Sequence, residues 1–372
     1  MARYVSAISV LLGATALGSG SAAKCGGNSS TTYAIPLAAA TGAVDVEFTS
    51  TNAVPDAPKL SAINSSSFDW WYFDTVSRGG DQGLAILFNA GLSSGLLGGN
   101  NETVPYFSIS GLLENGEYLN YVAWAEDDGA IITTGSDGSS KAVWTGTGGS
   151  WVATANMGTY TISVNAPQVN GTISFKSVAP AHNPCGPIQT GSDLLVAPSI
   201  GWTNPLPDAD ISVDLVTTTG PVKYSGVGYH DKNWGSQLFP STFNSWYWGH
   251  ARAGAYSVVW FEVLAPSNDT HYSGYLAKDG QILHSACGAE SITVRPLDTA
   301  YPRGDDESWP SGYTIEMEIG EQKELFTMTV TNVGILNDAA LAHRYVGTAN
   351  VFFHGEEFSG IGQWEELWLP YV

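Results

Sequence analysis

Short segments in which hydrophobic and polar residues alternate recur along most of the chain, and turn residues separate them. Examples are Tyr106–Leu113, Tyr118–Trp124, Tyr160–Val164, Thr172–Val178 and Phe326–Val333. A period of two residues is typical of a β-strand with one face in a core, and Asp-Gly pairs such as Asp279-Gly280 favour tight hairpins. The pattern predicts an all-β, antiparallel fold, and the best candidate for a helix is the short segment Asn337–His343.

Two aromatic segments about half a chain apart resemble each other. Phe68–Phe73 reads FDWWYF and Phe243–Trp248 reads FNSWYW, and each is followed by an Arg and Gly turn and an apolar segment. Coincidence in a Trp-rich chain is one explanation, and two copies of one β-domain are the other. Since 372 residues exceed what one core usually holds, we expect two β-barrel or sandwich domains in tandem, at residues 24–218 and 219–372.

The charge of the chain narrows the classes of partner. There are 35 Asp and Glu residues against 14 Lys and Arg, which gives a formal net charge of −21. Nucleic acid is therefore an unexpected partner, because phosphate binding needs a basic surface, and anionic membrane surfaces are disfavoured for the same reason. A hydrophobic content of 43% with 13% charged residues favours large cores over disorder.

The N-terminus has the features of a secretory signal peptide. Arg3 precedes the apolar segment Val5–Leu17, which is short for a membrane span, and the small residues Ser21-Ala22-Ala23 follow. We expect residues 1–23 to be removed and the protein to be secreted or held in a luminal or vesicular compartment. Five sequons then predict N-glycosylation at Asn28, Asn64, Asn101, Asn170 and Asn268.

Three cysteines allow one intramolecular disulfide and leave one thiol. Cys25 lies beside the predicted cleavage site, so Cys185–Cys287 is the better pair. The seven histidines show no HExxH or His-x-His spacing and there is no paired-Cys motif, so the sequence predicts no metal site. Nucleophile-elbow and P-loop motifs are also missing from the sequence.

The first candidate for chemistry is the segment Phe68–Asp74. On a strand, Asp69 lies on the same face as Trp71, whereas Tyr72 lies on the opposite face. A buried carboxyl group tends to have a raised pKa, so Asp69 could protonate a substrate or accept its hydrogen bond. The competing interpretation is an aromatic core strand in which the carboxylate is simply satisfied.

The second candidate is Gly226–Gly235, which contains the adjacent residues His230 and Asp231. Neighbours on a strand point to opposite faces, so Asp231 shares a face with Tyr229, and His230 does not. A catalytic or ligand-orienting role competes here with a bulge or turn that the Asp and Asn side chains hold.

The third candidate is the closing segment Phe358–Trp368. Gln363 and Glu365 share one face, and a strand that mixes carboxylates with Trp is compatible with a wet or ligand-bearing cavity. An edge strand with charged residues facing solvent is the commoner arrangement.

These segments together resemble the hydroxyneurosporene synthase-like superfamily, which includes carotenoid hydratases and fungal secondary-metabolite cyclases of the Diels–Alderase type. The motifs that carry the resemblance are FDWWYFD at 68–74, YHDKNWG at 229–235 and GIGQWEE at 360–366. The resemblance implies two lipocalin-like β-domains with a ligand cavity at or between them, and catalysis without an organic cofactor. The last strand has no convincing Lys to activate a tetramic acid carbonyl. This weakens the interpretation as a decalin-forming enzyme more than the interpretation as a cyclase in general.

The resulting hypothesis is an isomerase-type intramolecular cyclase, acting by [4+2] or acid-assisted cyclisation on a small hydrophobic polyketide, alkaloid or terpenoid, polyene or prenylated, in fungal secondary metabolism. Two alternatives are a hydratase or hydro-lyase on a prenyl or polyene chain, and a non-catalytic carrier of a hydrophobic metabolite. The expected catalytic residues are Asp69, His230 and Asp231. The expected substrate-binding residues are Trp71, Tyr72, Tyr229, Trp234, Trp246, Trp248, Gln363 and Glu365.

Overall fold

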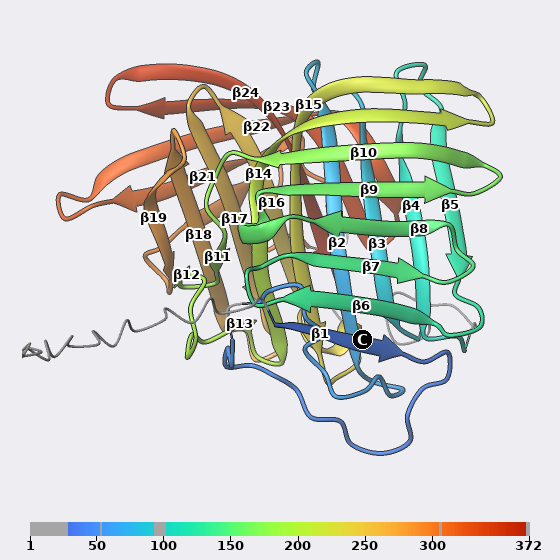
Figure 1. The fold of residues 1–372 in the computed structure, drawn as a ribbon. Coiled ribbons are helices and arrows are strands. Elements are labelled where there is room, and N and C mark those ends of the chain that lie inside the picture. Colours follow the sequence, from blue (N-terminus) through green and yellow to red (C-terminus); the bar gives the residue numbers. More distant parts are fainter. Residues whose placement is uncertain (1–28, 53, 93–101, 305–306, 370–372) are drawn as a thin grey trace, which may run out of the picture.

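The computed structural model describes residues 29–52, 54–92, 102–304 and 307–369. This part of the chain is all-β, as predicted, and forms two antiparallel sheets (Figure 1). Its only helical elements are two short 3-10 helices, η1 (Ala155–Met157) and η2 (Phe239–Ser241). Within the same residues, no helix is long and apolar enough to cross a membrane.

The first sheet contains most of the N-terminal half of the chain. In spatial order its main strands are β1 (Ser30–Ile35), β6 (Ala130–Gly135), β7 (Ser140–Trp144), β8 (Gly149–Ala153), β9 (Thr159–Asn165), β10 (Val169–Ser177), β14 (Ile200–Thr217), β15 (Gly220–Gly235), β2 (Phe68–Ser77), β3 (Gly83–Gly91), β4 (Pro105–Leu112) and β5 (Tyr118–Trp124). Three short strands join it beside β14: β11 (His182–Asn183), β12 (Gly186–Pro187) and β13 (Leu195–Ala197).

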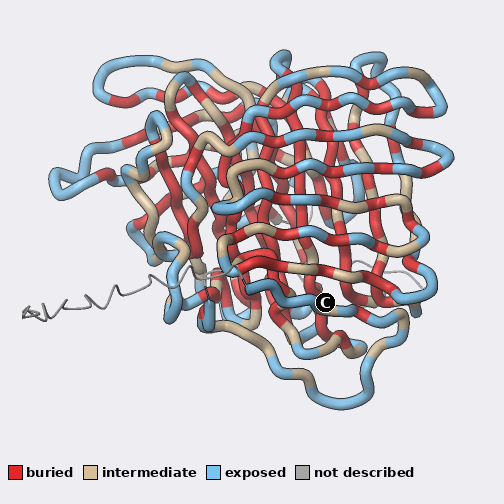
Figure 2. Tube along the Cα trace, viewed as in Figure 1, coloured by how far each residue is buried: buried red, intermediate tan, exposed pale blue. Residues whose placement is uncertain are grey.

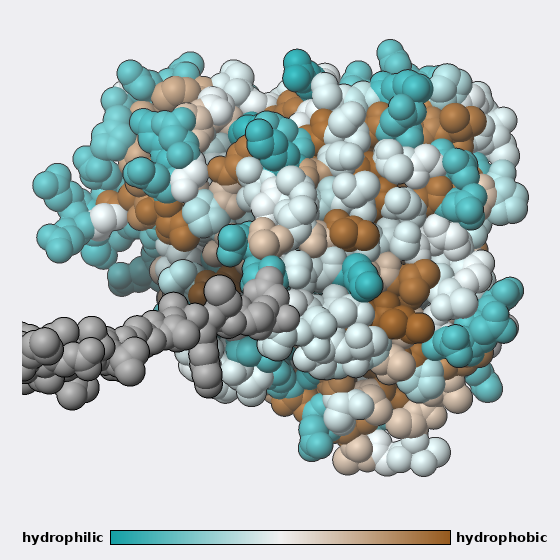
Figure 3. Space-filling view, viewed as in Figure 1, coloured by the Kyte–Doolittle hydropathy of each residue, from teal (hydrophilic) through white to brown (hydrophobic). Residues whose placement is uncertain are grey.

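This sheet curls back on itself, so that β6 to β10 run across β2 to β5 in Figure 1. A core of aromatic and aliphatic side chains fills the space between the two halves, including Trp71, Phe73, Trp144 and Trp151. The outer strands alternate between buried and exposed residues (Figure 2), because only one of their faces meets this core. On that outer face, hydrophobic residues lie in small groups among hydrophilic and neutral ones (Figure 3).

The second sheet has the strand order β19 (Gln281–Cys287), β18 (Thr270–Lys278), β17 (Tyr256–Leu264), β16 (Ser245–Ala253), β24 (Glu356–Trp368), β23 (Ala342–Phe353), β22 (Glu324–Ala339), β21 (Gly312–Ile319) and β20 (Thr293–Pro296). Two expectations are wrong here. The closing strand β24 is not an edge strand, because it pairs with β16 and β23. The segment Asn337–His343 is not helical, because it spans the hairpin between β22 and β23.

The two sheets pack against each other through β2, β3, β16 and β17, whose residues are buried on both strand faces. One face of each strand lies in the core of its own sheet. The other face meets the opposite sheet in a separate core that contains Tyr72, Trp202, Phe239 and Trp246. The contact between the sheets is therefore as aromatic as either interior.

The chain changes from the first sheet to the second between β15 and β16. The predicted boundary between residues 218 and 219 falls in the β14–β15 hairpin, and the division into two domains at that point stays a prediction. Cys185, beside β12, and Cys287, at the end of β19, form a disulfide bond. Since β11, which pairs with β12, also pairs with β14, this bond joins the margins of the two sheets.

Glycosylation and signal-peptide cleavage stay predictions. Asn28, Asn101 and the predicted signal peptide lie outside the described residues. Asn170 and Asn268 are exposed. The Asn64 side chain is half-buried and accepts hydrogen bonds from the backbone amides of Ser66 and Ser67.

Candidate active site

A cavity of about 180 Å³ lies between the two sheets. Its walls come from β2, β3, β4 and β15 on one side and from β16, β22, β23 and β24 on the other, with Phe239 of η2 between them. These strands come from distant parts of the chain, and their registers decide which side chains meet in the cavity.

On the first sheet, the lining side chains form two rows. Asp231 is paired in register with Tyr72, and Tyr72 with Leu87. One pleat further along, Asn233 is paired with Trp70, and Trp70 with Asn89. Because residues i and i+2 of a strand share a face about 7 Å apart, both rows face the cavity.

On the second sheet, two rows lie opposite. Trp248 is paired with Glu365 and Glu365 with Arg344, and Trp246 is paired with Leu367 and Leu367 with Ala342. The first of these rows meets the row of Asp231. The rings of Trp248 and Tyr72 lie 5.3 Å apart at their centroids, and the Arg344 guanidinium lies 5.0 Å from the centre of the Tyr72 ring.

Asp231 is the cavity's most unusual acid. Its Oδ2 atom accepts hydrogen bonds from Trp202 Nε1 and from the Tyr229 hydroxyl, each 2.8 Å long. Burial raises the pKa of Asp231 to about 8, with further increments from the negative charges of Glu365 and Asp74, and the two hydrogen bonds only partly offset this. The carboxyl group is therefore largely protonated at neutral pH.

Tyr72, the neighbour of Asp231 on β2, is held by two polar side chains. Its hydroxyl donates to Asp74 Oδ2 at 3.1 Å and accepts a hydrogen bond from Gln363 Nε2. Asp74 is in turn bound by His250 Nε2 at 2.8 Å, and the His250 ring stacks on Tyr229 with centroids 4.7 Å apart. This chain of contacts fixes both neighbours of Asp231, Tyr72 and Tyr229.

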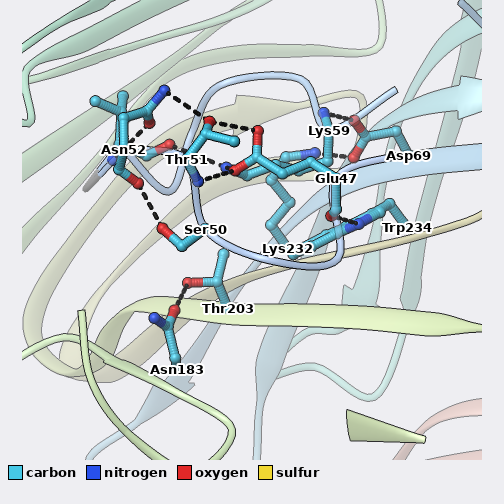
Figure 4. Close-up of polar contacts among 11 residues, drawn as sticks. Glu47, Ser50, Thr51, Asn52, Lys59, Asp69, Asn183, Thr203, Lys232 and Trp234 are labelled. Atoms are coloured by element: carbon cyan, nitrogen blue, oxygen red, sulfur yellow. Dashed lines mark hydrogen bonds and ion pairs between the residues drawn. The ribbon is translucent and has the colours of Figure 1, made fainter. Parts of the chain in front are cut away.

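Asp69 lies on the opposite face of β2, away from the cavity. Figure 4 shows its carboxylate with the backbone amide of Lys59, which donates to Oδ2 at 2.9 Å, and with the ion-pair partner Lys232. The Lys232 ammonium also lies 3.8 Å from the centre of the Trp71 ring, and burial lowers its pKa well below the usual value. Glu47 binds Lys59 Nζ at 3.0 Å and completes the cluster.

His230 also faces away from the cavity. Its Nδ1 donates to the Tyr72 carbonyl at 2.8 Å, and its Nε2 lies 3.0 Å from Asp56 Oδ1. Although burial alone would raise it, the hydrogen bond and charge of His230 hold the pKa of Asp56 below its usual value. Asp56 also accepts the hydroxyl hydrogens of Ser140 and Tyr160, so this pair anchors the segment before β2 inside the first core.

The structure thus separates the predicted site residues into two groups. The cavity is lined by Tyr72, Asp231, Trp246, Trp248 and Glu365. Tyr229 and Gln363 do not line it, but each is hydrogen-bonded to a residue that does: Tyr229 to Asp231 and Gln363 to Tyr72. The other group, Asp69, Trp71, His230 and Trp234, lies on faces that do not line it. The roles assigned to all of these residues stay proposals.

Several lining residues were missed in the sequence: Trp70, Leu87, Asn89, Tyr106, Asn233, Phe239, Asn337, Ala342, Arg344 and Leu367. Trp70, Asn233 and Leu367 were detectable, because each shares a strand face with a residue that was singled out. Arg344 and Asn89 belong to none of the motifs. No group of three His, Cys, Asp or Glu side chains that could hold a metal ion occurs in the part of the chain that the structure describes.

Comparison with known proteins identifies the family of this chain. A family model described as Diels-Alderase-like matches residues 36–328. The chain belongs to the Diels-Alderase-like family. Two fungal relatives are quinolone epoxide rearrangement proteins. The one from Emericella nidulans is 31% identical over 88% of this chain and 90% of its own length. The one from Penicillium thymicola is 30% identical over 82% of this chain and 86% of its own length. A Diels-Alderase of Acremonium is 26% identical over 64% of this chain and 60% of its own.

Solved structures agree with the Diels-Alderase-like assignment at the level of the fold. The crystal structure of CghA superposes with a TM-score of 0.75 at 16% identity, over 92% of this chain and 99% of that one. Kievitone hydratase from Nectria haematococca superposes with a TM-score of 0.53 at 14% identity, over 90% and 96%. The arrangement of two packed antiparallel sheets is therefore shared across these proteins.

Proposed function

We propose that this protein is an isomerase that rearranges or cyclises a hydrophobic epoxide intermediate of fungal secondary metabolism, with Asp231 as the proton donor. The observation that carries the proposal is the position of a carboxyl group with a pKa of about 8 on the wall of a cavity lined by aromatic rings. General acids work best when their pKa lies near the operating pH. The acid role expected at Asp69 is thereby assigned to Asp231.

The hydrogen bonds of Asp231 indicate which oxygen gives up the proton. Trp202 and Tyr229 both donate to Oδ2, so in the neutral acid the hydrogen belongs on Oδ1. Oδ1–H donates its proton to the epoxide oxygen as one C–O bond breaks, and the electron pair of that bond stays on the oxygen.

The carbocation that forms is consumed within the same molecule. A hydride, a carbon substituent or an internal π bond moves to the electron-poor carbon, and the proton released from the product returns to the Asp231 carboxylate. Substrate and product have the same formula, and the reaction as proposed needs no organic cofactor. The rings of Trp70, Tyr72, Trp246 and Trp248 line the cavity, and aromatic faces stabilise a cation by about 0.5–2 kcal/mol each.

The relatives support the choice of an acid-assisted reaction. Two of them are named as quinolone epoxide rearrangement proteins, and the one from Emericella nidulans matches almost the full length of both chains. A pericyclic [4+2] closure would need positioning but no acid, and the buried acid at Asp231 would then be a cost without a use.

We also infer entry into the secretory pathway, which the Cys185–Cys287 disulfide supports. Separate measurement of the protein in the culture medium, the membrane-enclosed compartments and the cytosol tests that inference.

The function is tested by deletion of the gene followed by mass spectrometry of the metabolites. The accumulated compound is then incubated with the purified protein. Conversion into the missing product at unchanged mass supports the isomerase. A mass difference of one water supports a hydratase or hydro-lyase instead, and binding without conversion supports a carrier; either result contradicts the proposal.

A further inference from the structure

The cavity is closed behind Asp231 by a layer of buried polar side chains. One pleat beyond the row of Asp231, the same strand faces carry Tyr229, Asp74, His250 and Gln363, each at most 1% exposed. Tyr229 and Gln363 each bind a residue of the Asp231 row, and Asp74 binds His250 across the two sheets. This end of the cavity is therefore sealed by the strands themselves.

The opposite end has no such layer from the strands. The second row of lining side chains is formed by Asn233, Trp70 and Asn89 on the first sheet and by Trp246, Leu367 and Ala342 on the second. All six strands begin or end within two residues of this row. Segments that connect the strands must therefore close the cavity here.

Phe239 of η2 forms the wall at this end, beside β15 and β16. Among the described residues that line the cavity, it is the one that lies outside a strand. The centroid of its ring lies 5.0 Å from that of Trp70 and 5.5 Å from that of Trp246, so the ring packs against both sheets. Phe239 is 3% exposed, whereas the preceding Leu238 is 46% exposed. The step from Leu238 to Phe239 therefore crosses from solvent to the cavity wall.

The segment that carries Phe239 is held at both of its ends. The Ser236 carbonyl accepts a hydrogen bond from the Ser66 hydroxyl at 3.1 Å, and the Asn244 amide donates to the Leu264 carbonyl at 2.7 Å. The turn between them is closed by bonds between residues three apart. Truncation of the Phe239 ring should therefore remove the wall and leave the course of the backbone in place.

Water at this wall would change the product of the proposed reaction. The row of Trp70 lies one pleat, about 7 Å, from the row of Asp231, so water in place of the Phe239 ring comes close to the reacting atoms. Exclusion of water protects reactive intermediates from hydrolysis. If water captures the carbocation, its oxygen forms the new C–O bond and one of its protons passes to the Asp231 carboxylate. The product is then a diol, heavier than the substrate by one water.

We propose that Phe239 determines the product of the reaction, because its ring keeps water from the carbocation and the substrate leaves as an isomer instead of a diol. The cavity also meets solvent at the exposed lining residue Asn337. There the substrate enters and fills the opening itself, whereas Phe239 closes the end at which the strands stop. The inference rests on the proposed function, since it requires a cation that the acid generates.

The test uses the purified compound that accumulates when the gene is deleted. Mass spectrometry measures the ratio of diol to isomer that each variant forms from it, with hydrolysis in the absence of enzyme subtracted. Phe239→Ala should raise this ratio about tenfold or more over the wild type. Phe239→Leu keeps part of the side chain and should raise it less, and it replaces Phe239→Ala if that variant does not fold. Leu238→Ala, on the exposed side of the same segment, is the matched control and should keep the wild-type ratio.

A double variant keeps the two proposals distinguishable. Phe239→Ala combined with Asp231→Asn should form neither product, because both products need the acid. A wild-type ratio in the folded Phe239 variants, or a rise of the same size in Leu238→Ala, overturns the role of Phe239 alone. A wild-type protein that forms no isomer, or turnover that survives in the double variant, contradicts the proposed function instead.

Discussion

Trp202 on β14 donates its indole hydrogen to Oδ2 of Asp231 on β15, at 2.8 Å. The Tyr229 hydroxyl binds the same oxygen at the same distance. Two neutral donors thus fix one oxygen of a buried carboxyl group, and the other oxygen is available to carry a proton. Burial outweighs these two hydrogen bonds, which is why the pKa of Asp231 rises to about 8.

The first prediction concerns the pH dependence of catalysis. If Asp231 is the proton donor, kcat/KM for the isomerisation should be constant below about pH 7 and fall as pH rises through about 8, because the acid loses its proton. A pH profile of the purified enzyme measures this. A rate that increases with pH across the same range would indicate a general base and contradict the assignment.

The second prediction concerns stability. The pKa of Asp231 is about 8 in the folded protein against an ordinary value of 3.8, so between these values the folded state binds the proton more tightly than the unfolded chain. The stabilisation is fully present below pH 3.8 and is lost as pH rises through 8. Asn at this position does not titrate, so Asp231→Asn should gain stability relative to the wild type as pH rises from 5 to 9.

Urea denaturation at several pH values measures this difference. The matched control is Asp214→Asn, since Asp214 is an exposed residue of β14. A difference between Asp231→Asn and wild type that does not change with pH would show that the carboxyl group is not buried in its neutral form.

The third prediction concerns the buried ion pair of Asp69 and Lys232. Removal of one partner leaves an unpaired charge in the interior and typically costs about 3–5 kcal/mol. Asp69→Asn and Lys232→Met should each lower the free energy of unfolding by about this amount, and the double variant Asp69→Leu with Lys232→Met should recover most of it. Turnover per folded molecule should persist, because neither side chain lines the cavity. An Asp69→Asn protein of normal stability without turnover would restore the acid role to Asp69.

Much of the strand-level arrangement was predictable, because side chains alternate at every step of a regular strand. Asp231 and Asn233 do share one face, and His230 and Lys232 the other. Which face meets the cavity was not predictable. Both faces of β2 and β15 are buried over the relevant segment, so hydrophobicity does not distinguish the core face from the cavity face.

The internal similarity illustrates the same limit. The letters align Trp71 with Trp246, yet Trp71 lies in the core of the first sheet and Trp246 lines the cavity. Residues that align between the two segments therefore face the core of the sheet in β2 and the cavity in β16. Arg344 was not predictable for another reason: it reaches the site only because β23 pairs with β24, and no local pattern marks it.

The fourth prediction concerns the disulfide. Cys185 and Cys287 are 102 residues apart and join the margins of the two sheets. Loss of a native disulfide typically costs 2–5 kcal/mol, about 4 or more for a loop of this length. Cys287→Ser should lower the denaturation midpoint accordingly, with Cys25→Ser as the control for loss of a thiol. Equal midpoints for Cys287→Ser and wild type would show that the bond adds no stability.

The most direct test of the central claim is the turnover of Asp231→Asn on the compound that accumulates when the gene is deleted. Asn keeps the size of the side chain and can still accept the hydrogen bonds of Trp202 and Tyr229, but it cannot donate a proton as an acid. The account predicts a fall in kcat of about 10²- to 10⁴-fold, with the circular dichroism spectrum unchanged and Asp214→Asn fully active. An Asp231→Asn enzyme that forms the same isomer at the wild-type rate would contradict it.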